Sequence, residues 1–146
     1  MTPAMLLLLF ACGDKDGDNI LDGGATDDSG QDTAPPADTE CPVIEHEPIE
    51  TTQTVGVSVP ITATVTDATA VFVVELYFKK ETSTTWQRLN MAASPGTSLY
   101  ASEIPGSQVG SGGMDYYIKA VDTEQYACTL PLDGEGEPFH FLVSED

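Results

Sequence analysis

Basic residues are scarce in this chain. Five Lys and Arg stand against 24 Asp and Glu, which gives the 146 residues a formal net charge of -19 at neutral pH. A chain with this balance repels the phosphates of nucleic acids and the headgroups of anionic lipid surfaces. We therefore exclude a role in binding DNA or RNA.

Motifs of the common enzyme classes are also absent. The sequence has no Gly-x-Ser-x-Gly, no His-Glu-x-x-His and no P-loop lysine. The glycine-rich residues 110–113 lack the strand-to-helix setting that a phosphate-binding loop requires. The two histidines, His46 and His140, fit solvated or cross-strand positions better than the role of a catalytic base. We expect a non-enzymatic protein, with a hydrolytic enzyme as the weaker hypothesis.

The apolar run near the N-terminus is short. Residues 5–11 form a run of seven apolar side chains, whereas a membrane-spanning helix needs about 20. This length is typical of the apolar core of a secretory signal peptide. The sequence thus predicts a signal peptide over residues 1–11.

A cysteine closes this apolar run. Leu9, Ala11 and Cys12 resemble the lipobox of bacterial lipoproteins, which has an aliphatic residue, a small residue and then the lipidated cysteine. The resemblance implies export, cleavage before Cys12 and a membrane anchor through lipid on that cysteine. It also implies a location in the bacterial cell envelope, periplasmic or at the cell surface. The alternative is a chance hydrophobic N-terminus on a soluble protein.

Residues 12–40 contain almost no large apolar side chains beyond Ile20 and Leu21. Such a segment cannot bury enough surface to offset the entropy of its chain. We expect a disordered, Asp-rich tether. As a flexible coil it would span about 30 Å, and repulsion between its carboxylates favours longer distances.

Carboxylates alternate within this tether in the manner of short calcium loops. The segment resembles the start of an EF-hand loop or of a thrombospondin type 3 calcium repeat. The candidate calcium ligands are Asp14, Asp16, Asp18 and Asp22. The affinity expected of such a loop is no better than about 0.1 to 1 mM. The alternative is a solvated acidic linker.

From residue 41 onward, apolar and polar side chains alternate between turn signals. Residues 59–65 and 114–120 show this alternation, and a further set is expected to face the core: Phe72, Val74, Leu76 and Phe78. A period of two with frequent turns predicts an all-β fold. Residues 41–146 therefore predict one domain of about seven strands with the spacing of an immunoglobulin-like β-sandwich.

Several segments of this domain resemble a known module. Residues 116–122 (Tyr-Tyr-Ile-Lys-Ala-Val-Asp), with residues 42–46, 76–78 and 104–106, are similar to fibronectin type III-like modules of bacterial secreted proteins. The resemblance covers residues 42–143. It implies an immunoglobulin-like sandwich that serves as a spacer or binding module and has no catalytic residues.

The cysteine count is consistent with export. Lipid on Cys12 would leave Cys41 and Cys128, and an even pair in an exported chain predicts a disulfide. The alternatives are two free thiols, or a metal site with His46 or His140. The short ligand spacing of known metal motifs is missing.

Alternation also predicts which side chains lie on the outer face of one sheet. Three strands of an immunoglobulin-like arrangement would bring together an aromatic-cation face: Tyr77, Lys79, Trp86, Arg88, Tyr117 and Lys119. Aromatic and cationic side chains suit a protein or glycan partner, because Trp, Tyr and Arg dominate binding hot spots. The alternative is ordinary cross-strand packing, in which Tyr rings cover Lys and Arg stems.

Two classes of function follow. The favoured one is a membrane-tethered, non-enzymatic envelope lipoprotein whose β-sandwich binds or spaces an envelope protein or glycan. The second is a calcium-responsive structural lipoprotein, in which an ion bound at residues 14–22 stiffens the tether.

Overall fold

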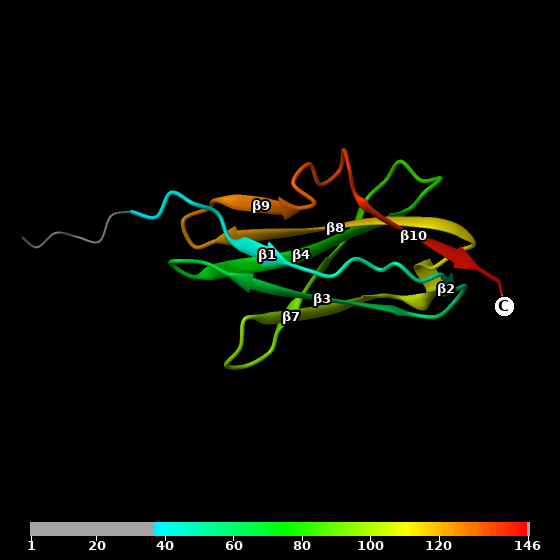
Figure 1. The fold of residues 1–146 in the computed structure, drawn as a ribbon, viewed down its shortest axis with the longest axis horizontal. Helices are drawn as coiled ribbons and strands as arrows, with labels where there is room; N and C mark the ends of the chain where they lie inside the picture. Colours follow the sequence, from blue (N-terminus) through cyan, green and yellow to red (C-terminus); the bar gives the residue numbers. More distant parts are fainter. Residues whose placement is uncertain (1–36, 146) are drawn as a thin grey trace, which may run out of the picture. The chain divides into compact units, whose positions relative to one another are not determined.

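The computed structural model describes residues 37–145 (Figure 1). Cys12 and the candidate calcium ligands Asp14, Asp16, Asp18 and Asp22 lie outside these residues. The described chain is all-β, and its one helical element is the 3-10 turn η1, Gly106–Gln108. No helix in residues 37–145 is long and apolar enough to cross a membrane.

Within residues 37–145, ten strands form two sheets that pack face to face (Figure 1). The four-stranded sheet has the order β1-β3-β7-β6, formed by Val43–Glu45, Val59–Thr66, Leu99–Ile104 and Ala92–Ala93. The second sheet has the order β2-β10-β8-β4-β5, formed by Gln53–Thr54, Phe139–Ser144, Gly112–Asp122, Val71–Lys80 and Gln87–Asn90. Strand β9, Ala127–Leu130, pairs with β8 beyond the end of β10. The two packed sheets confirm the fold class predicted from the alternation, an all-β sandwich.

The core lies between the two sheets and comes from the inward side of each strand. In β3 the alternation is complete, because every second residue is buried while the threonines between them face outward. The opposite sheet contributes the largest side chains, and Phe78 and Tyr116 are both at most 1% exposed. A β-branched side chain suits such a pleated surface, which explains the Val and Ile content of β3.

A β-bulge turns one residue that was expected in the core toward solvent. Phe72 was expected to face the core with Val74, but its side chain is 66% exposed. The register between β4 and β8 shifts between Val71 and Val73. A bulge inserts an extra residue and reverses the alternation on one side of it. Val71 therefore packs against the core in place of Phe72.

A buried tyrosine fixes the segment that crosses from one sheet to the other. β1 belongs to the four-stranded sheet and β2 to the six-stranded sheet. Between them, the Tyr116 hydroxyl accepts a hydrogen bond from the Ile49 amide (3.1 Å) and donates one to His46 Nε2 (2.9 Å). His46 Nδ1 in turn donates to the carbonyl oxygen of Thr62 (2.6 Å). This chain of bonds needs a neutral imidazole ring.

The neutral His46 ring predicts a pH effect on stability. Burial lowers the pKa of His46 below its ordinary value of 6.5, although the bond to Thr62 and the charge of Glu47 oppose the shift. The unfolded chain then binds more protons than the folded chain, so the free energy of unfolding decreases as the pH falls below 6.5. We expect His46→Gln to reduce this loss between about pH 7.5 and pH 5, as measured by urea unfolding. If the free energy of unfolding of His46→Gln falls with pH as steeply as that of the unmodified chain, the assignment to His46 is wrong. His140→Gln is the matched control and should retain the contribution of His46 to the pH dependence.

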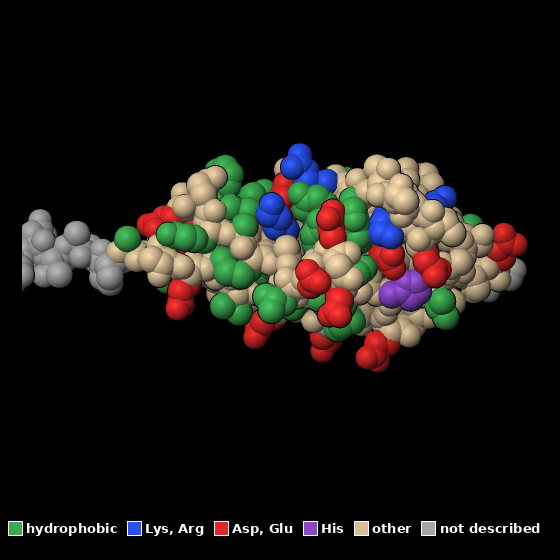
Figure 2. Space-filling model, turned by 90° about the horizontal axis from the view of Figure 1, so that it is seen from above, with side chains coloured by type: hydrophobic (Ala, Val, Ile, Leu, Met, Phe, Trp, Pro, Cys, Tyr) green, Lys and Arg blue, Asp and Glu red, His purple; other side chains and the backbone are tan. Residues whose placement is uncertain are grey.

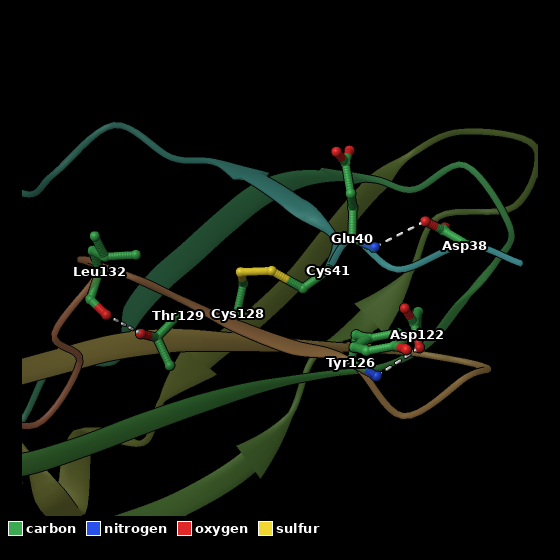
Figure 3. The surroundings of a disulfide bond; sticks show 8 residues. All are labelled: Asp38, Glu40, Cys41, Asp122, Tyr126, Cys128, Thr129 and Leu132. Atoms are coloured by element: carbon green, nitrogen blue, oxygen red, sulfur yellow. Dashed lines mark hydrogen bonds between the residues drawn. A yellow bond between two sulfur atoms is a disulfide. The ribbon is translucent and has the colours of Figure 1, made fainter.

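A disulfide joins the two sheets at one end of the sandwich (Figure 3). Cys41 lies just before β1, and Cys128 lies in β9 on the other sheet. Their Cα atoms are 5.6 Å apart, and 87 positions separate them in the sequence. The disulfide predicted from the cysteine count is therefore present, and neither thiol is free.

Removing this bridge should destabilise the domain strongly. In the chain-entropy model, a bridge across so long a loop stabilises the fold by about 4 to 5 kcal/mol. We expect Cys41→Ser combined with Cys128→Ser to lower the free energy of unfolding by that amount in urea titrations. Cys12→Ser is the control and should leave it unchanged. A loss below about 1 kcal/mol in the double variant would contradict this role.

Candidate functional site

The six residues of the aromatic-cation face lie on or beside three neighbouring strands, β5, β4 and β8. The register places Tyr77 opposite Arg88 on one side and opposite Tyr117 on the other. Lys119 lies opposite Glu75, and Trp86 directly precedes β5. Figure 2 shows Lys and Arg side chains interspersed with hydrophobic and acidic ones on the surface seen from above.

Three aromatic rings form the centre of this face. Tyr77 and Tyr117 stack in parallel, with ring centroids 4.7 Å apart and an interplanar angle of 4°. Trp86 meets Tyr117 edge to face at 4.9 Å. Lys79 Nζ lies 5.1 Å from the centroid of the Trp86 ring, within the range of a cation-π interaction. Two strands and the segment before a third thus form one continuous aromatic cluster.

Lys79 is held at a second point by a carboxylate. Its Nζ lies 2.8 Å from Asp115 Oδ2, and His140 Nδ1 lies 2.8 Å from Asp115 Oδ1. Burial alone would raise the pKa of Asp115, but the hydrogen bonds and charges of Lys79 and His140 lower it overall. Asp115 is therefore ionised at neutral pH, and it links β4, β8 and β10.

Arg88 is held in a similar way on the other side of the cluster. Arg88 Nη1 lies 3.1 Å from Glu75 Oε1, and the Tyr77 hydroxyl donates to Glu75 Oε2 at 3.1 Å. Glu75 is only 8% exposed, so this carboxylate is paired rather than solvated. Burial is the main cause of the raised pKa of Tyr77, and the interactions with Glu75 add to it while those with Arg88 oppose it. Tyr77 is therefore a neutral hydrogen-bond donor.

The members of this face differ in how accessible they are. Tyr117 is only 6% exposed, and burial, with the charges of Glu135 and Glu75, raises its pKa to about 12. Trp86 and Tyr77 are partly buried, whereas the Arg88 side chain is 60% exposed. Arg88 is thus the most accessible member of the face, and Tyr117 is the most buried.

The sequence reasoning did not identify the two acidic members of this site. As an isolated carboxylate in a predicted strand, Glu75 is expected from the sequence to be solvated, and the sequence indicates no role for Asp115. The structure corrects the first expectation, because Glu75 pairs with Arg88 and is almost fully buried. The alternation already placed Glu75 on the same side of β4 as Tyr77 and Lys79, and this was the available signal.

The histidines do not form a pair. His46 follows β1 of the four-stranded sheet, and His140 lies in β10 of the six-stranded sheet. A shallow hollow beside His46 is bordered by Glu45 and Glu47. Both ring nitrogens of His46 are already hydrogen-bonded, so neither is available as a base without breaking the bonds that hold residues 46–49.

Comparison with known proteins gives no family for this chain. No family model matches it, and no curated protein matches it at a significant level of similarity.

The stacked tyrosines should be energetically coupled. Parallel aromatic pairs contribute about 0.5 to 1.5 kcal/mol beyond the surface they bury. We therefore expect a double-mutant cycle of Tyr77→Ala and Tyr117→Ala to give a coupling energy in this range, measured from urea unfolding. The matched cycle combines Tyr77→Ala with Tyr100→Ala on the other sheet, where the two effects should add. Equal coupling in both cycles would contradict the stack.

Proposed function

We propose that this chain is an exported lipoprotein, anchored to a membrane through lipid on Cys12, whose β-sandwich binds an envelope protein or glycan. The proposed protein is non-enzymatic and resides in the bacterial cell envelope, on the periplasmic side or at the cell surface. The observation that carries the binding role is the aromatic-cation face. Its aromatic rings contact each other across neighbouring strands, and Arg88 projects from it into solvent.

We further propose that the sandwich is of the immunoglobulin or fibronectin type III-like kind. The strand order supports this assignment. β1, β3 and β7 take the places of strands A, B and E, while β10, β8 and β4 take those of G, F and C. β5 lies beside β4 in the place of strand C′, an addition to the G-F-C sheet that variable-type immunoglobulin domains also have.

The charge distribution supports recognition at this face. The domain has four basic residues, Lys79, Lys80, Arg88 and Lys119, and three of them belong to the face. Glu75 and Asp115 hold Arg88 and Lys79 in fixed positions. A preorganised set of side chains loses less conformational entropy on binding than a mobile one. The otherwise acidic surface would repel acidic partners elsewhere on the domain.

Crosslinking in the native envelope tests the binding role. We expect the unmodified protein to capture a defined protein or glycan, and Trp86→Ser combined with Arg88→Ser to lose it. This pair removes the accessible part of the face and leaves the Tyr77–Tyr117 stack in place. The matched control is Leu99→Ser with Glu103→Ser, two exposed positions of β7 on the other sheet. Equal recovery of the partner with both double variants would remove this face from consideration.

A further inference from the structure

Three aspartates from distant segments meet at one end of the sandwich. Asp38 precedes β1, Asp67 follows β3, and Asp122 is the last residue of β8. One carboxylate oxygen from each residue lies within 4.8 Å of those of the other two. Figure 3 shows Asp38 and Asp122 to the same side of the Cys41–Cys128 disulfide.

Two buried oxygens of this group have no hydrogen-bond partner among residues 37–145. Asp122 is 0% exposed, and its Oδ2 is one of them. Asp38 Oδ2, which is also buried, is the other. An unpaired buried carboxylate oxygen is costly, and a buried charge is normally paired or bound to a metal. None of the ion pairs within residues 37–145 includes these aspartates.

The other oxygen of each carboxylate is fixed by a nearby backbone amide. Asp122 Oδ1 accepts from the Tyr126 amide at 2.9 Å, and Asp38 Oδ1 accepts from the Glu40 amide at 3.0 Å. Asp67 Oδ2 accepts from the amide two residues further along its own loop. These bonds hold all three carboxylates in place and leave Oδ2 of Asp38, Oδ1 of Asp67 and Oδ2 of Asp122 as the oxygens without a hydrogen bond in the described chain.

We propose that Asp38, Asp67 and Asp122 bind one calcium ion. Carboxylate oxygens are the ligands that this hard cation prefers, and calcium-oxygen distances of about 2.3 to 2.6 Å place opposite ligands about 5 Å apart. One carboxylate oxygen from each of the three residues lies within 4.8 Å of the other two, which is compatible with such a sphere. Magnesium demands a near-ideal octahedron and gives up its waters reluctantly, so proteins usually hold it through only one or two carboxylates. Waters complete the coordination, because Asp38 and Asp67 are partly exposed.

This site is separate from the candidate ligands at residues 14–22. A bound ion would join residue 38 to the loop that follows β3 and to the end of β8, beside the bridge between Cys41 and Cys128. Calcium would therefore stabilise the folded domain itself at the place where residues 37–40 join it. The expected affinity is about 0.1 to 1 mM, the range of extracellular modules with part-exposed ligands.

Calcium titration of the full chain tests this site. The titrated variant, called the background chain, carries Asp14→Asn, Asp16→Asn, Asp18→Asn and Asp22→Asn, so that residues 14–22 contribute no carboxylate ligands. Calorimetry with calcium chloride should then show one equivalent bound, and the melting temperature should rise with calcium concentration. A parallel titration uses magnesium chloride.

Three further substitutions in this background locate the ion. Asp122→Asn and Asp67→Asn should each weaken calcium binding at least about tenfold, because affinity in such sites depends on the charge of the ligands. Asp122→Asn keeps an oxygen that accepts from the Tyr126 amide, and a circular dichroism melt confirms that each variant is folded. Asp133→Asn, at an exposed position, is the matched control and should bind calcium like the background chain.

Two outcomes would overturn the proposal. In the first, the background chain shows no heat of calcium binding and no rise in melting temperature with calcium. In the second, Asp122→Asn, Asp67→Asn and Asp133→Asn bind calcium with equal affinity. Tighter binding of magnesium than of calcium overturns the assignment of the ion.

Discussion

The register between β4 and β8 is the constraint on which the rest of the structure depends. β8 pairs with β4 along one edge, and with β10 and then β9 along the other. Its alternate residues build both faces of the sheet, with Tyr116 and Ile118 in the core and Tyr117 and Lys119 on the outside. A slip by one residue would exchange the two sets. The packing of the core therefore fixes the geometry of the aromatic-cation face.

The disulfide and the aspartate cluster lie at the same end of the sandwich. The described chain begins at the end that holds the Cys41–Cys128 disulfide, and its C-terminus lies at the opposite end (Figure 1). Asp38 and Asp122 of the proposed calcium site lie near the disulfide in Figure 3, and Asp67 has a carboxylate oxygen within 4.8 Å of theirs. A covalent bridge and an ion would then reinforce the place where the proposed tether meets the domain, and the aromatic-cation face would remain a preformed surface on the six-stranded sheet.

The sequence predicted those parts of the fold that depend on local alternation. β3 and β8 were anticipated because residues 59–65 and 114–120 alternate between core-facing and outward-facing side chains, and the disulfide followed from the cysteine count. Phe72 was misplaced because a β-bulge leaves no mark in the alternation. The roles of Glu75 and Asp115 depend on side chains brought close by strand register and by the neighbouring β10 strand, which a single sequence does not specify. The aspartate cluster was missed for the same reason, since its members come from three separate segments.

We propose that this β-sandwich works at a membrane, held there by lipid on Cys12. Mass spectrometry of the mature protein purified from its native envelope tests that claim most directly. We expect a chain that begins at Cys12 and carries lipid on that residue. An unlipidated chain that begins at Met1 would contradict it.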